Sequence, residues 1–512
     1  MAKSSEIGVH KGKAKRVHNN NIPHISEAKQ HLRDNVVISI QQILNQMHPA
    51  SMDCSIYRVP QQLCDMNPKA YIPQFISIGP FHHSKCQNNS KGTQKYKHYG
   101  LFNFLRRINN TEIKEEEDVM TKSRSFQPKT LKVLVEKVHD WVEKTRYCFS
   151  EPIDYMDDHN FVIMMLMDAC FIVEFFIQMY DDQFDQDDQF PLISDKVNIL
   201  SLFPEITDFI MFDLIKLENQ VPFFLLQHVF DMIPRHNLHV SFIDLTYCAL
   251  RIGFIFNYKI YSFDYDFVKK DLKHLVHFLS LYFIPPPTTN DMIQNKKKNN
   301  YSFLSFFSRL LCCELCQNPD KENSDQEFLS PPSITELNES GVTVKKAKNV
   351  ESLMNITFTN GVLEIPPLNI CDEFELLFRN LVAFEQFQAG NGKMYATQYI
   401  IFMDNLINTK KDVRLLVNSG VIINNIGGSY KEVSKLFNKL GKFISGSPTS
   451  SEFNDISKDL HKHCNRRWNK AKASLKHNYF NTPWAIVSFI AASCLILLTL
   501  LQTIFSGFSA FP

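Results

Sequence analysis

The sequence has almost no net charge. Its 55 lysines and arginines face 54 aspartates and glutamates, which leaves a formal charge of +1 over 512 residues. Because nonspecific nucleic-acid binding depends on a basic surface, this balance argues against a nucleic-acid partner. The first thirty residues contain no apolar run, so no secretory signal peptide is expected. The 12 cysteines are mostly scattered, which fits a reducing compartment better than a disulfide framework.

Common catalytic signatures are also missing. The sequence contains no G-x-S-x-G, no G-x-x-x-x-G-K-[ST], no G-x-G-x-x-G and no H-E-x-x-H. These are the motifs of serine hydrolases, P-loop nucleotide-binding proteins, dinucleotide-binding folds and zinc proteases. Two clusters of possible zinc ligands, Cys313–Cys316 and His461–Cys464, lie far apart, whereas zinc sites usually combine two pairs at a set spacing. We therefore expect no enzyme, no cofactor and no metal.

The last apolar stretch carries no charge at all. Trp484–Phe505 would form a helix about 33 Å long, enough to cross a bilayer core of about 30 Å. Basic residues precede it and none follows, so the positive-inside rule predicts a cytoplasmic body and a C-terminus outside or in a lumen, at the plasma membrane or an endomembrane. The alternative is a buried C-terminal helix of a soluble domain. The residues expected at the membrane interface are Arg466, Arg467, Lys470, Lys472, Lys476 and Trp484.

Helical periodicity dominates the remainder of the chain. The expected fold is mostly α (α+β): a large helical body with a small β-hairpin element and one C-terminal transmembrane helix. The expected organisation is a disordered basic N-terminus at 1–34, a helical body at 35–460 with an insertion or linker at 285–332, a basic juxtamembrane helix at 461–483, a transmembrane helix at 484–506 and a short tail at 507–512.

A second long apolar run occurs at Asn160–Tyr180. It is apolar nearly all round, so it is either a central buried helix or a second membrane span. Asp168 in its middle would cost about 2.5–3.5 kcal/mol at the centre of a bilayer. We therefore expect a buried helix in which Asp168 is ion-paired, with Arg58 or Arg146 as the partner.

The hairpin is predicted from a two-residue turn signal. Ile356–Thr359 and Val362–Ile365 flank Asn360 and Gly361. This Asn-Gly pair is favoured in type I′ turns, which require a positive φ at both central residues.

Polar residues interrupt two apolar segments of the body. Glu218, Asn219 and Gln220 stand in LENQVPFF, and Glu385 and Gln386 stand in NLVAFEQF. Each group either converges on a ligand or forms a buried hydrogen-bond cluster, because buried polar groups need partners. Glu218 and Glu385 could also approach each other as a pair of acids for general acid–base work. The complete set of structural polar residues is Arg58, Asp168, Glu218, Asn219, Gln220, Glu385 and Gln386.

Several motifs together resemble a plant family. They are IYRVP, AYIPQFISIGPFHH, MMLMDACF, DLIKLENQVPFF, TELNESGV, FTNGVLEIPPL, NLVAFEQ and YFNTPWA. In this order they resemble the plant domain-of-unknown-function 247 family, which is UPF0481-like. The resemblance implies a plant protein with a mostly helical body, a C-terminal membrane anchor and no established catalytic activity; some grass members are implicated in pollen self-incompatibility. The sequence departs from the family at Lys216, where an apolar residue is usual, and in KYKHYG at Lys95–Gly100.

Three functional hypotheses follow. The first is a single-pass, tail-anchored membrane protein that acts in recognition or signalling through protein contacts, with the lipid bilayer and other proteins as partners. The alternative is a membrane-bound hydrolase or transferase that uses Asp168, Glu218 or Glu385. The third is an ion- or lipid-handling protein with a second span at Asn160–Tyr180. The loops expected to carry specificity in the first hypothesis are Glu112–Arg124, Asp181–Asp188 and Pro285–Pro332.

Overall fold

The computed structural model divides into two compact units, Met1–Cys54 and Ser55–Pro512. Of the three loops expected to carry specificity, 112–124 lies outside the described residues, as do most of 181–188 and 285–332. The structure describes residues 22–46, 54–83, 93–109, 128–184, 204–234, 240–253, 272–284, 329–348, 352–387, 394–444, 453–466, 469, 471 and 483–509.

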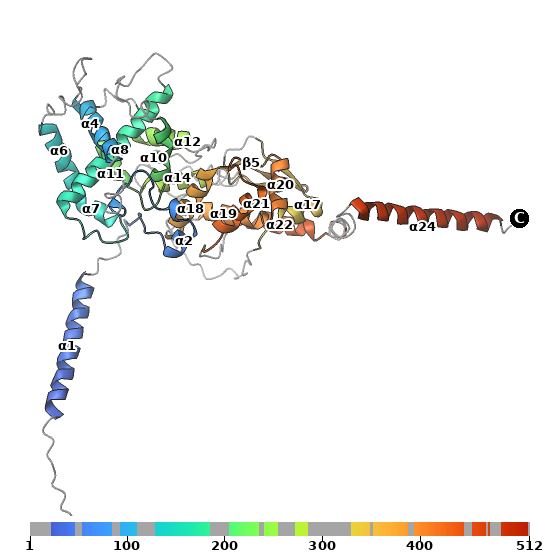
Figure 1. Cartoon of the computed structure of the whole chain (residues 1–512), viewed down its shortest axis with the longest axis horizontal. Helices are drawn as coiled ribbons and strands as arrows, with labels where there is room; N and C mark the ends of the chain where they lie inside the picture. The colour runs from blue at the N-terminus through green and yellow to red at the C-terminus, as the bar shows by residue number, and fades with distance from the viewer. Residues whose placement is uncertain are drawn as a thin grey trace, which may run out of the picture. The chain divides into compact units, whose positions relative to one another are not determined.

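The first unit contains one long helix, α1 (Ile22–Gln46; Figure 1). The expected disordered segment 1–34 therefore overlaps a helix, and only residues 1–21 of it lie outside the described part. The expectation was wrong from Ile22 onward because it was drawn from polarity, although lysine, glutamate, glutamine and arginine are good helix formers. The apolar residues exposed along α1 include Leu32, Val36, Ile40 and Leu44.

The first half of the second unit is built around α8 (Asp158–Phe184). Within the described residues, four longer helices and the short α7 (Val142–Tyr147) pack against it, and 83% of its most apolar window is buried inside the protein. The apolar run Asn160–Tyr180 is therefore part of a buried core helix, as expected from the aspartate in its middle. The four longer helices packed on α8 are α4 (Gln94–Asn109), α6 (Pro128–His139), α11 (Phe223–Phe230) and α12 (Phe242–Gly253). The shorter elements of this half are α2 (Gln61–Met66), η1 (Pro68–Ala70), α7 (Val142–Tyr147), α10 (Pro204–Leu214), α14 (Leu275–Ser280) and η4 (Leu281–Phe283).

The second half combines helices with two small sheets. Its helices are α17 (Ile334–Glu339), α18 (Asp372–Phe387), α19 (Tyr395–Leu406), α20 (Lys410–Asn418), α21 (Tyr430–Leu440) and α22 (Asn454–Cys464). Its strands are β1 (Thr343–Lys346), β2 (Thr357–Thr359), β3 (Val362–Ile365), β4 (Leu368–Ile370) and β5 (Ile422–Asn424). Contacts between α14 and α18 join the two halves.

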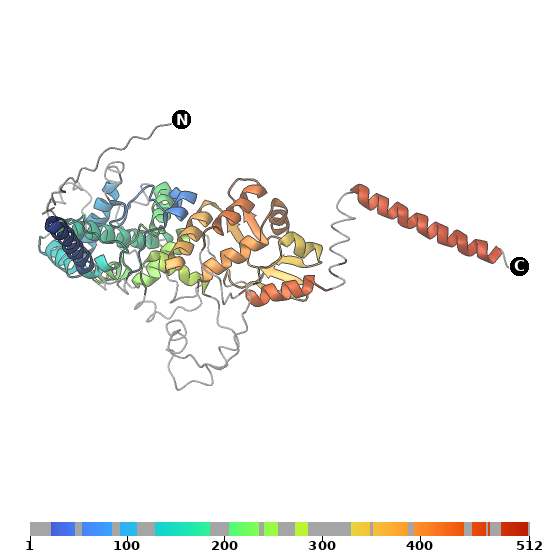
Figure 2. The ribbon, with the colours of Figure 1, turned by 90° about the horizontal axis from the view of Figure 1, so that it is seen from below.

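The predicted hairpin is confirmed. β2 and β3 pair antiparallel, and Asn360 and Gly361 between them have φ values of 51° and 77°, as a type I′ turn requires. The sheet is larger than expected, because β1 pairs parallel with β3, and β4 pairs parallel with β5 in a second sheet. Figure 2 shows the yellow strands beside α22, which packs on β2.

This packing changes the boundary expected at residue 461. α22 begins at Asn454 and buries Asn454, Ser457 and Leu460, so it belongs to the body rather than to a juxtamembrane helix. The expected juxtamembrane helix at 461–483 therefore begins inside a body helix. Arg466 is exposed just after α22. The other basic residues expected at the interface, Arg467, Lys470, Lys472 and Lys476, lie outside the described residues.

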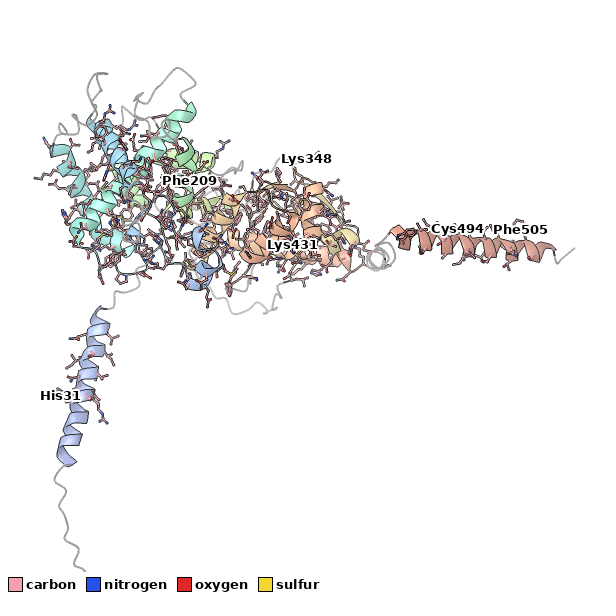
Figure 3. The ribbon with its side chains drawn as sticks, in the orientation of Figure 1. His31, Phe209, Lys348, Lys431, Cys494 and Phe505 are labelled. Atoms are coloured by element: carbon pink, nitrogen blue, oxygen red, sulfur yellow. The ribbon has the colours of Figure 1, made fainter. Side chains whose placement is uncertain are left out.

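The final helix is α24 (Pro483–Ser509), close to the span expected at 484–506. None of its most apolar window, within Val487–Ser506, is buried inside the protein, and Trp484 at its start is 80% exposed. In Figure 3 its side chains, Phe505 among them, project from the helix. This C-terminal helix is long and apolar enough to span a membrane.

Candidate functional site

An irregular segment, Ile72–His83, runs through the interior of the first half. Pro73 and Pro80 keep it from forming a helix, so its buried N–H groups need other acceptors. Asp213, at the end of α10, supplies one. Its carboxylate accepts hydrogen bonds from the backbone N–H groups of Gln74, Phe75 and Ile76, the last two at 2.6 and 2.7 Å.

Asn219 continues this support. Its Oδ1 accepts the Ile78 N–H at 2.6 Å, while its Nδ2 donates to the carbonyls of Ile76 and Asp213. Gln220 donates from Nε2 to the Leu214 carbonyl at 2.6 Å and accepts the Leu275 N–H through Oε1. Both side chains are almost completely buried. The amides of LENQ therefore hold the loop between α10 and α11 to the irregular segment and to the start of α14.

Glu218 joins Arg58 and Val59 to His82 at the end of the irregular segment. Its carboxylate accepts the Val59 N–H at 2.8 Å and lies 2.9 Å from both Arg58 Nη1 and His82 Nε2. Burial opposes ionisation, but the hydrogen bonds from His82, Val59 and Arg58 outweigh it and lower the pKa of Glu218. Arg58 also stacks on Phe81, with its guanidinium carbon 4.1 Å from the ring centroid.

Asp168 is ion-paired, but its partner is neither Arg58 nor Arg146. It is fully buried on α8, pairs with Lys97 of α4, and accepts the Gly79 N–H at 2.8 Å. Arg146 instead pairs with Asp158 at the start of the same helix. Lys97 lies in KYKHYG, the segment that matched the family only loosely.

Two further buried ion pairs flank this cluster. Lys216 is 2% exposed; its Nζ lies 2.8 Å from Asp213 and donates to the Ile72 carbonyl. Burial lowers the pKa of Lys216, although the Asp213 carboxylate opposes that shift. Arg107 on α4 holds Glu174 on α8 through two hydrogen bonds of 3.1 and 2.9 Å. We call the set of Asp168, Lys97, Asp213, Lys216, Glu218, Asn219 and Gln220 the polar core.

Glu385 lies apart from this set, in the second half. At the end of α18 it accepts the N–H groups of Ala396 and Thr397, at 3.0 and 2.7 Å, and the Thr397 hydroxyl at 2.6 Å. It therefore caps the N-terminus of α19 from another helix. Burial raises the pKa of Glu385 to about 7. Gln386 contacts the Met394 sulfur at 3.7 Å. Glu385 and Glu218 have separate sets of partners, so the structure gives no sign of a pair of acids.

A cavity of about 530 Å³ opens beside the polar core. The Asp168–Lys97 pair lies in its lining, together with His83 and Gln94. Methionines and Ile163 from α8 form the apolar part of its wall. Burial lowers the pKa of His83, so this imidazole is neutral at pH 7.

In the described parts of the chain, no group of three or more histidine, cysteine and acidic side chains could hold a metal ion. His461 bonds instead with the Ser330 carbonyl at 2.7 Å, and His463 packs edge-on against Phe358. The cysteines of Cys313–Cys316 lie outside the described residues.

Comparison with known proteins places the chain among plant proteins. A family model described as a plant protein of unknown function, DUF247, matches residues 56–498. UPF0481 protein At3g47200 of Arabidopsis thaliana is 28% identical over 459 residues, covering 88% of this chain and 85% of the relative. Putative UPF0481 protein At3g02645 of the same plant is 23% identical over 561 residues, covering 96% and 98%. No solved structure gives a significant match. With more than four-fifths of its length matched by that model, the chain belongs to the DUF247 family of plant proteins.

Proposed function

We propose that this protein is a single-pass, tail-anchored membrane protein whose helical body acts in recognition through contacts with other proteins. The exposure of α24 carries the proposal. Leu495, Ile496, Leu497 and Leu498 are each more than 60% exposed without lipid, a surface that soluble proteins avoid. Burial in hydrocarbon would favour insertion by about 0.3–0.6 kcal/mol for each such residue.

The proposed orientation follows from the charges before α24. Arg466 and the basic residues after it precede the helix, and no charged residue follows it. The positive-inside rule then favours a cytoplasmic body and a C-terminus outside or in a lumen, at the plasma membrane or an endomembrane. Protease digestion of sealed microsomes tests this orientation: the body should be cut while α24 stays protected. A body protected until detergent is added would reverse the proposed orientation.

A non-enzymatic role is favoured by what the buried carboxylates do. Asp213 and Glu218 accept hydrogen bonds from backbone N–H groups, and Glu385 caps a helix. Each of these carboxylates therefore has a structural role. The proposed specificity surfaces are the loops 112–124, 181–188 and 285–332, which vary at little cost on a rigid body. Exchanging these loops with those of a relative should change the proteins captured by proximity labelling but not membrane residence. If the captured proteins stay the same, the loops do not select partners.

A further inference from the structure

The cavity beside the polar core contains an unusual combination of groups. Lys97 and Asp168 are 3% and 0% exposed, yet both line the cavity. Burying two charges is costly, and an apolar pair of similar volume would stabilise a fold as well or better. An ion pair retained in the wall of a cavity is therefore a candidate binding group.

Lys97 leaves hydrogen-bond donors at the floor of the cavity, which is formed by the Asp168–Lys97 pair. Asp168 has one oxygen on the Gly79 N–H and the other on Lys97. An ammonium group has three donors, and within the described residues Asp168 is the one polar partner of Lys97. Gln94 also lines the cavity. A ligand that reaches this floor must accept hydrogen bonds.

Helix α8 supplies an apolar part of the cavity wall. Met164 is 4% exposed, Ile163 is 44% exposed, and Met167 completes this side of α8. Methionine adapts to ligands of irregular shape because its side chain is unbranched and flexible. Two acidic residues line the cavity; Asp168 is paired with Lys97, so Asp157 is the one that opposes an anionic ligand. Asp157 lies at the exposed start of α8, where its carboxylate accepts the Asn160 N–H and solvent screens its charge.

We propose that the cavity binds a small amphipathic carboxylate, with the carboxylate on Lys97 and the apolar part against Met164 and Met167. This assigns a small-molecule site to the body, in addition to recognition through protein contacts. The site lies outside the membrane helix, so it does not depend on α24 being an anchor.

The test uses the full chain in lipid nanodiscs and three probes of equal chain length: hexanoate, hexanol and hexylamine. Isothermal titration calorimetry, with empty nanodiscs subtracted, gives the three affinities. Hexanoate should bind at least tenfold more tightly than either of the others, which corresponds to about 1.4 kcal/mol. Equal affinities, tighter binding of hexylamine, or no binding of hexanoate would each overturn the proposal.

Variants then locate the site. Met167→Trp should fill the cavity and abolish hexanoate binding, whereas Met167→Leu, which keeps the volume, should retain it. The charge-neutral double variant Lys97→Gln/Asp168→Asn should bind hexanoate no better than hexanol. Asp157→Asn, which preserves the helix cap, should strengthen hexanoate binding about twofold without changing hexanol. If the double variant does not fold, the Met167 and Asp157 variants test the proposed site instead. Unchanged hexanoate binding in Met167→Trp would contradict the site.

Discussion

The polar core makes a quantitative prediction at Asp213 and Lys216. The two side chains are 1% and 2% exposed, and the ammonium lies 2.8 Å from the carboxylate. Asp213→Asn keeps the shape of the acid but leaves the lysine charge buried without a counter-ion. Breaking a buried pair in this way costs about 3–5 kcal/mol. Because whole domains are stable by only about 5–15 kcal/mol, the loss should be easy to measure.

The reverse change should cost less. Lys216→Met removes the charge, while Asp213 keeps three backbone N–H groups of the irregular segment as partners. A charge-assisted hydrogen bond is worth about 1.5–3 kcal/mol, and the apolar replacement offsets part of that loss. The double variant has no orphaned charge, so adding Lys216→Met to Asp213→Asn should recover about 1–3 kcal/mol.

Urea unfolding followed by helical circular dichroism measures all four members of this cycle. The expected order of unfolding free energy is wild type, Lys216→Met, the double variant and then Asp213→Asn. A surface substitution, Lys132→Met on α6, serves as the control and should change stability by less than about 0.5 kcal/mol, because this lysine is 77% exposed. If the double variant is less stable than Asp213→Asn, the two side chains do not act as a buried ion pair.

Three further predictions follow from single residues. Gly79→Ala should destabilise the protein by more than about 1 kcal/mol in the same urea assay, because φ is +69° and the added Cβ would lie 2.7 Å from the Gln220 carbonyl oxygen. Glu385 has a folded pKa of about 7, above its ordinary 4.5, so stability should fall by about 3 kcal/mol as pH rises from 4.5 to 7, and Glu385→Gln should remove that dependence. Burial lowers the pKa of His274 to about 3, so stability should be lost as pH falls below 6.5, by up to about 1.4 kcal/mol per pH unit. Burial also lowers the pKa of His277 to about 4, so His274→Asn, which can still cap α14, should reduce that loss without abolishing it, and an unchanged slope would contradict the role of His274.

Sequence reasoning worked where the signal was local. The Asn360–Gly361 turn is fixed by two residues, and the all-round apolar character of α8 is visible in one window. Sequence reasoning did not find the pairing between strands that lie far apart in the chain. β1 pairs parallel with β3, and parallel strands are not joined by a short turn, so no local sequence signal links the two. The extent of α1 was missed because polar residues with high helix propensity resemble a disordered tail.

The polar core was also predictable in its local features but not in its long-range contacts. The residues of LENQ could be recognised as buried polar groups, since three of them interrupt an apolar segment. Their distant partners could not be found, because those of Asn219 are backbone groups of Ile76 and Ile78, more than a hundred residues earlier. Lys97 was missed as the partner of Asp168 because a lysine carries no mark of burial in the sequence.

Membrane residence through α24 is the claim on which the proposed function depends most. The direct measurement compares the full chain with a chain that ends at residue 482, both expressed in plant cells and extracted with alkaline carbonate. The full chain should remain in the membrane pellet, and the truncated chain should appear in the supernatant. A truncated chain that stays in the pellet, or a full chain released by carbonate, would contradict anchoring by this helix.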